Sequence, residues 1–93
     1  MPVFMSTHRK VIAYIHLGYQ RKPFAIWELR EGTLVSTSSV TRTLAKLVDL
    51  RLVRHLSKPG FKDRNYEVTK LWHDTGDVMK VIEIYELAKI LNI

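Results

Sequence analysis

The sequence predicts an α+β fold that is mainly α, in which three helices precede a β hairpin and a longer helix follows it. Apolar residues recur at three- and four-residue spacing in four segments, as amphipathic helices require. Two short strand-like segments flank a turn at Pro59-Gly60, which is the arrangement of a hairpin. The chain has 93 residues, the size of one domain, so we treat residues 1–93 as a single domain.

Three short helices are predicted before the hairpin. The first covers Thr7–Leu17, with Ser6 at the N-cap position that serine favours. Phe24 is assigned to a very short strand, and the second helix follows at about Ala25–Glu31. The third helix covers about Thr37–Leu50. Its apolar stripe has the spacing of a core-facing helix and consists of Val40, Leu44, Leu47 and Val48.

The hairpin is predicted over residues 52–69. Its first strand, Leu52–Leu56, is rich in leucine and β-branched residues, and its second, Tyr66–Thr69, alternates with a period of two. A basic turn at 57–65 joins them.

Positive charge is concentrated in the first two-thirds of the chain. The net charge is +6 and the pI is about 9.8. Residues 1–64 contain 12 Lys/Arg against 4 Asp/Glu, whereas residues 65–93 contain 3 against 5. This asymmetry indicates one surface for a polyanionic partner and another surface for a different contact. The alternative is that the charge serves only solubility.

The composition also argues against several classes of protein. There is no cysteine, which excludes disulfides and thiolate metal sites and favours an intracellular, cytoplasmic location. No apolar run approaches the roughly 18 residues of a membrane span, and Met1–Ser6 lack a signal-peptide pattern. The four histidines are isolated, and no nucleophile elbow or phosphate-binding glycine loop occurs. We therefore expect no enzyme activity, no cofactor and no metal site.

The outer face of the third helix is suited to reading DNA bases. At roughly 100° per residue, Ser38, Arg42 and Lys46 lie opposite the apolar stripe, and Ser39 and Thr43 flank them. A helix of this kind fits the major groove, where arginine bonds guanine bidentately and hydroxyls reach base edges or phosphates. An ordinary solvated helix face remains the alternative.

The turn of the hairpin carries a second basic group, formed by Lys58, Lys62 and Arg64. Cations at a hairpin tip contact phosphates or enter a narrow minor groove. The alternative is a charged loop that contacts only solvent.

The last helix, about Asp77–Leu91 with Asp74 or Thr75 as its cap, is apolar around much of its circumference. One stripe is expected to cover the domain itself and the other to meet a second copy about a two-fold axis. A monomer with this helix sunk in its own core is the alternative. The predicted dimer interface is Val81, Ile84, Tyr85, Leu87, Ala88 and Leu91.

The order of these elements, with particular residues at tight spacing, resembles a known family. The residues that carry the resemblance are Phe24, Ile26-x-x-Leu29, Ser38-Ser39-Val40-x-Arg42-x-Leu44-x-x-Leu47, Leu52-Val53, the basic segment 58–64, and Tyr66-Glu67-Val68-Thr69. Over residues 7–70 the chain resembles the winged helix-turn-helix DNA-binding domains, most closely small MarR- or PadR-like regulators. The resemblance implies a three-helix core, a two- to three-stranded β wing at 52–69, and a dimerisation helix within 75–93.

The chain departs from that family at two places. Arg51 stands where the family usually has glycine before the first wing strand, at a helix end that suits a left-handed backbone. A strained but tolerated residue or a different turn would explain it. Residues 70–74 also intervene before Thr75-Gly76, where the family usually begins its last helix directly.

Together these observations predict a sequence-specific regulator of transcription that binds double-stranded DNA as a homodimer and associates with the nucleoid when bound. Helix 37–50 would enter the major groove, and the turn 57–65 would contact phosphate or the minor groove. Two alternatives remain. One is a protein-interaction module of a transcription assembly, since fold does not fix function. The other is a ligand-responsive repressor with a pocket beside the last helix, lined by Trp72 or Tyr85.

Overall fold

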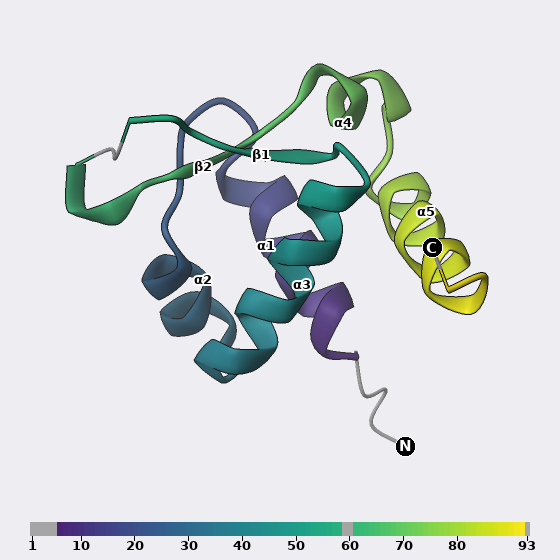
Figure 1. The fold of residues 1–93 in the computed structure, drawn as a ribbon, viewed down its shortest axis with the longest axis horizontal. Coiled ribbons are helices and arrows are strands. Elements are labelled where there is room, and N and C mark those ends of the chain that lie inside the picture. The colour runs from purple at the N-terminus through teal and green to yellow at the C-terminus, as the bar shows by residue number, and fades with distance from the viewer. Residues whose placement is uncertain (1–5, 59–60, 93) are drawn as a thin grey trace.

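A computed structural model describes residues 6–58 and 61–92 of the chain. This part contains five α-helices and a two-stranded antiparallel sheet, as the α+β, mainly α prediction expects. The sheet projects from one side of the helical body, and α5 lies at the opposite side (Figure 1). The helices and strands in chain order are α1 (Thr7–Gly18), α2 (Ile26–Thr33), α3 (Thr37–Asp49), β1 (Val53–His55), β2 (Tyr66–Val68), α4 (Lys70–Thr75) and α5 (Val78–Ile90).

Helices α1, α2 and α3 lie close to their predicted ranges. Ser36 caps α3, since its Oγ accepts a hydrogen bond from the Ser39 amide at 3.3 Å. Leu34, in the turn between α2 and α3, adopts the left-handed conformation at φ 59° and is almost fully exposed. Gly32 permits the close approach of α1 and α2, because a Cβ there would lie 2.0 Å from the ring of Tyr14. The connection between α2 and α3 is therefore short and sharply turned.

The two strands are shorter than predicted but pair as a hairpin. Val53 faces Val68 and His55 faces Tyr66 in the antiparallel register. Phe24 adds an isolated bridge to Tyr66, with backbone hydrogen bonds of 2.8 and 3.1 Å. The strand predicted at Phe24 is thus reduced to a single bridge, which anchors the base of the hairpin to the start of α2.

Helix α3 ends in a Schellman motif that leads directly into β1. The Leu52 amide donates to the Leu47 carbonyl at 3.0 Å, and the Arg51 amide donates to the Val48 carbonyl at 3.0 Å. Arg51 has φ 63°, the left-handed conformation that usually selects glycine. Of the two explanations considered for Arg51, the structure shows the strained but tolerated one.

A short helix, α4, was not predicted. It fills the segment 70–74 that separates the hairpin from the last helix, and Gly76 ends it at φ 68°. The predicted cap of the last helix is also corrected. The Asp77 carboxylate, not Asp74 or Thr75, caps α5 by accepting from the Met79 amide at 2.9 Å.

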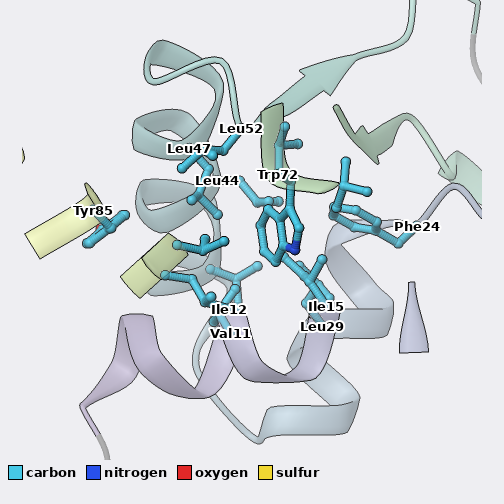
Figure 2. Packing of buried hydrophobic residues seen from close by; sticks show 14 of the residues in the cluster. Val11, Ile12, Ile15, Phe24, Leu29, Leu44, Leu47, Leu52, Trp72 and Tyr85 are labelled. Atoms are coloured by element: carbon cyan, nitrogen blue, oxygen red, sulfur yellow. The ribbon is translucent and has the colours of Figure 1, made fainter. Parts of the chain in front are cut away.

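The core lies between α1, α3 and α4, and Trp72 of α4 is at its centre (Figure 2). The indole is 1% exposed, and its Nε1 donates to His16 Nδ1 at 3.2 Å, so its one polar atom is bonded. Phe24 packs at one edge of the cluster, and Tyr85 of α5 covers the opposite edge (Figure 2). The segment that the sequence left unassigned therefore supplies the largest core side chain.

Helix α5 is tied to the start of α1 by a polar cluster. The Glu86 carboxylate accepts hydrogen bonds from Arg9 at 2.7 Å and contacts His8 Nε2 at 2.6 Å. The hydrogen bond with Arg9, followed by that with His8, lowers the pKa of Glu86 to about 2. The His8 ring also stacks on Tyr85, with centroids 4.7 Å apart. These contacts fix the angle at which α5 crosses the domain.

Candidate nucleic-acid interface

The side of α3 that faces away from the core presents Ser38, Thr41, Arg42 and Ala45, all of them exposed. Ser38 and Arg42 thus occupy the exposed positions that their predicted role requires. Arg42 makes no ion pair with any described residue, so its guanidinium is available to a ligand. Thr41 was missed because it lies about 100° from the centre of the apolar stripe, at the margin that helical periodicity leaves ambiguous.

Thr43 is a correction to the predicted set. It is 3% exposed, because it lies between Val40 and Leu47 on the helix surface and close to the buried stripe. Ser39 and Lys46 are half-buried at the same flank. The exposed face of α3 is therefore shifted toward Thr41 and Ala45 and away from Thr43.

Lys58 and Lys62, at the far end of the hairpin, are exposed as predicted, whereas Pro59 and Gly60 lie outside the described residues. Lys62 has φ 55° within a single 3₁₀ turn, Phe61–Asp63. Its carbonyl accepts from Trp27 Nε1 at 2.7 Å, which fastens the hairpin turn to α2.

Arg64, which was predicted to contact DNA, forms an ion pair within the fold. Its Nε donates to Glu28 of α2 at 2.9 Å, and its guanidinium lies 5.5 Å from the centre of the Trp27 ring. The same carboxylate accepts from the Tyr19 hydroxyl at 3.0 Å and the Ala25 amide at 3.1 Å. Burial alone would raise the pKa of Glu28, but these hydrogen bonds outweigh burial and lower it. Arg64 is thus the cation that neutralises a half-buried carboxylate.

The exposed face of α5 carries only part of the predicted dimer interface. Val81, Tyr85 and Ala88 are buried against the rest of the chain, which corrects their assignment to a partner surface. Ile84 is half-buried, whereas Leu87 and Leu91 are 57% and 65% exposed. Met79 and Ile90 extend this apolar surface, with 49% and 78% of their area exposed. The sequence showed that α5 has two apolar stripes, but it did not show which stripe packs on the core and which one is exposed.

Three hollows border α3. One of about 440 Å³ separates its N-terminus from the hairpin and is lined by Arg30, Thr37 and Asp63 among others. A second, of about 260 Å³, runs between Ala45 and His55 on the hairpin side. The third, of about 310 Å³, lies on the opposite flank, toward α1 and α5. The suggested pocket at Trp72 is corrected, because that indole is buried in the core, whereas Tyr85 does line the third hollow.

Comparison with family models, curated proteins and solved structures finds no match to this chain. No group of three or more histidine, cysteine, aspartate or glutamate side chains that could hold a metal ion occurs among the described residues. Within the same residues, no helix has the length and apolar character needed to cross a membrane.

Proposed function

We propose that this chain is a sequence-specific, double-stranded DNA-binding regulator of transcription that acts as a homodimer. In this proposal the domain is a winged helix-turn-helix, with α3 as the recognition helix and the β1–β2 hairpin as its wing. Two α3 helices would enter successive major grooves roughly 34 Å apart and read a two-fold related site.

The observation that carries the proposal is the position of Arg42. It lies in the middle of the exposed side of α3, beside Ser38 and Ala45. The only carboxylate on the outer side of this helix is Asp49, in its last turn. An arginine with small and hydroxyl-bearing neighbours can approach base edges closely and bond guanine. A surface that evolved only for solubility would usually mix charges of both signs.

The arrangement around α3 supports the same proposal. The hairpin is fastened beside α2 through Arg64 with Glu28 and through Trp27 with the Lys62 carbonyl, so Lys58 and Lys62 are held on a positioned turn. Phosphate contacts from such lysines would fix the register of α3 on the duplex without reading sequence.

The test is a titration of duplex DNA against the protein over a salt series, after selection of a preferred sequence from a random pool. Binding should weaken steeply with salt, because phosphate contacts release counterions. Arg42→Ala should weaken binding to the preferred site by about 1–3 kcal/mol and relax the preference at one position. The control is Arg21→Ala, another exposed arginine, in the loop before α2. Arg21→Ala should either weaken binding to all DNA sequences equally or leave binding unchanged. Normal site preference in Arg42→Ala would refute the assignment of α3.

The exposed apolar face of α5 favours one second candidate, a protein-interaction module of a transcription assembly. In that case duplex DNA should not bind even at low salt, and α5 should contact a different protein. The same titration therefore separates the two functions.

A further inference from the structure

The third hollow, where the start of α1, the middle of α3 and the end of α5 meet, is lined mainly by polar groups. Its volume is about 310 Å³. None of the described side chains that line it carries a carboxylate. They are Ser6, Thr7, His8, Ser39, Arg42, Thr43, Tyr85 and Lys89. Arg42 and Lys89, from two different helices, supply its positive charge, and an anion is therefore the ligand that its lining favours.

Thr43, a largely buried residue, lines this hollow with a hydroxyl that solvent still reaches, since no fully buried side-chain oxygen or nitrogen among the described residues lacks a partner. Thr43 is 3% exposed, yet its side chain makes no hydrogen bond with the described part of the chain. A threonine within a helix commonly bonds the carbonyl four residues earlier, as Thr33 does with Leu29 at 2.6 Å. A hydroxyl in a largely buried position is most stable when it has a hydrogen-bond partner. A ligand in the hollow would satisfy it.

Ser39 offers a second hydroxyl at the same place. Ser36 donates to the Ser39 oxygen at 3.0 Å, which leaves the hydrogen of the Ser39 hydroxyl available for donation.

The N-terminus of α1 also faces the hollow without its own cap. Ser6 holds the N-cap position, but its side chain caps no backbone amide of the helix and instead bonds His8 Nε2 at 3.4 Å. No acidic residue lies in the first turn of this 12-residue helix, so within the described residues its positive dipole end has no capping side chain. Glu86 does not take this role, because Arg9 and His8 occupy its carboxylate. An anion at this end would complete the helix.

We propose that the hollow binds a phosphate group. Arg42 and Lys89 would balance its charge, Thr43 and Ser39 would donate hydroxyl hydrogen bonds, and the α1 N-terminus would contribute backbone amides. The phosphate has two possible sources: a free phosphate or phosphomonoester, or the backbone of DNA held against α3. Only the second source depends on the proposed function.

The first experiment is a nuclear magnetic resonance titration of the full chain with inorganic phosphate, at constant ionic strength set by chloride. Saturable shifts are expected at the amides of Thr7, His8 and Thr43. Thr43→Val keeps the side-chain shape without the hydroxyl, and Lys89→Gln removes a charge. Each should weaken phosphate binding about 10-fold. The matched controls are Thr41→Val on the exposed side of α3 and Lys80→Gln on α5, neither of which lines the hollow, and both should bind normally.

A stability measurement guards against misfolding as an explanation. Because the Thr43 hydroxyl makes no hydrogen bond with the described residues, Thr43→Val should unfold at an equal or higher temperature than the wild type when phosphate is absent. The proposal would be overturned if the chemical shifts changed without saturating as phosphate is added, or changed in the same way when chloride is added. Equal loss of binding in Thr41→Val and Thr43→Val would overturn it as well.

Duplex DNA distinguishes the two sources. If the backbone supplies the phosphate, Thr43→Val should weaken binding about equally for all sequences, and added phosphate should compete. If the ligand is free phosphate, Thr43→Val should bind inorganic phosphate more weakly and bind duplex DNA with the affinity of the wild type. Phosphate binding in a protein that binds no duplex would refute the proposed DNA function and leave the phosphate site standing.

Discussion

Arg51 shows how one residue carries strain that its neighbours compensate. Its left-handed backbone lets the Leu52 amide reach the Leu47 carbonyl, and both leucines are buried. A left-handed conformation costs an L-residue about 1–2 kcal/mol, whereas glycine adopts it readily. The hydrogen bonds and apolar contact of the Schellman motif are what offset this cost.

We expect Arg51→Gly to raise the free energy of unfolding by up to about 1 kcal/mol, because the relief of strain exceeds the extra entropy that glycine gives the unfolded chain. Urea denaturation followed by circular dichroism measures it. Arg51→Ala is the control, since it removes the charge and keeps the strained backbone, and it should not stabilise the protein. If both variants unfold alike, the backbone at this position is not the source of strain.

Glu86 should make stability depend on acidity. Its pKa is about 2 in the folded chain against an ordinary 4.5, so its ionised form stabilises the fold above about pH 4.5. That contribution is lost as the pH falls from 4.5 through 2. Glu86→Gln should therefore lower the temperature of unfolding at pH 6 and change it little at pH 2. Thermal scans at several pH values, with Glu83→Gln on the exposed side of α5 as control, measure it. Equal effects of Glu86→Gln at both pH values would show that the carboxylate acts by packing alone.

The exposure of a single residue could be predicted from the sequence where the helical periodicity alone determines which side of the helix it occupies. The stripe of α3 placed Ser38 and Arg42 on the exposed side correctly. Thr43 was misplaced because it lies at the margin of the buried stripe, beside Val40 and Leu47, where helical periodicity alone does not decide burial. The ion pair of Arg64 with Glu28 was not predicted, because the two residues lie 36 positions apart in the sequence.

At the scale of elements, α4 is the clearest difference between sequence and structure. It has only six residues, fewer than two turns, so no apolar stripe can form along it. Its single large apolar anchor is Trp72, and packing, more than propensity, stabilises so short a helix. Longer elements with several apolar positions, such as α3 and α5, were found within one or two residues of their ends. The hairpin was found from its turn residues and β-branched strands, although pairing stops sooner than the pattern suggested.

Trp72→Ala should destabilise the protein by about 3–5 kcal/mol, a large share of the stability of a small domain, because it leaves a cavity between α1, α3 and α4. Urea denaturation by circular dichroism measures this loss. The other tryptophan is a matched control. Trp27 is half-buried, and Trp27→Ala should lose about 1 kcal/mol with its hydrogen bond to the Lys62 carbonyl. Similar losses in the two variants would mean that α4 does not anchor the core.

At the scale of the whole molecule, the lysines of the hairpin and the exposed leucines of α5 lie on different sides (Figure 1), although Arg42 shares a hollow with Lys89 of α5. Arg42, Lys58 and Lys62 belong to α3 and the hairpin, whereas Leu87, Ile90 and Leu91 are exposed on α5. The hairpin and α5 lie at opposite sides of the helical body (Figure 1). A second copy that covers α5 would leave both hairpins accessible. This arrangement is compatible with the DNA-binding homodimer that we propose.

The proposed dimer depends on apolar contacts that a carboxylate would destroy. Leu87→Glu should raise the dissociation constant at least about 100-fold, because a two-fold interface loses two buried leucines worth about 1.5–3 kcal/mol each. The fold should survive, since Leu87 is 57% exposed in the single chain. Light scattering over a concentration series measures the change, and circular dichroism verifies the fold. The control is Leu17→Glu on α1, where the leucine is 85% exposed and lies in a hollow beside α2. This variant should stay dimeric.

A wild-type chain that is monomeric at every concentration, or two variants that dissociate alike, would exclude α5 as the interface. Arg42 and the hairpin would then act on a single half-site, with the weaker and less selective DNA binding that one module provides.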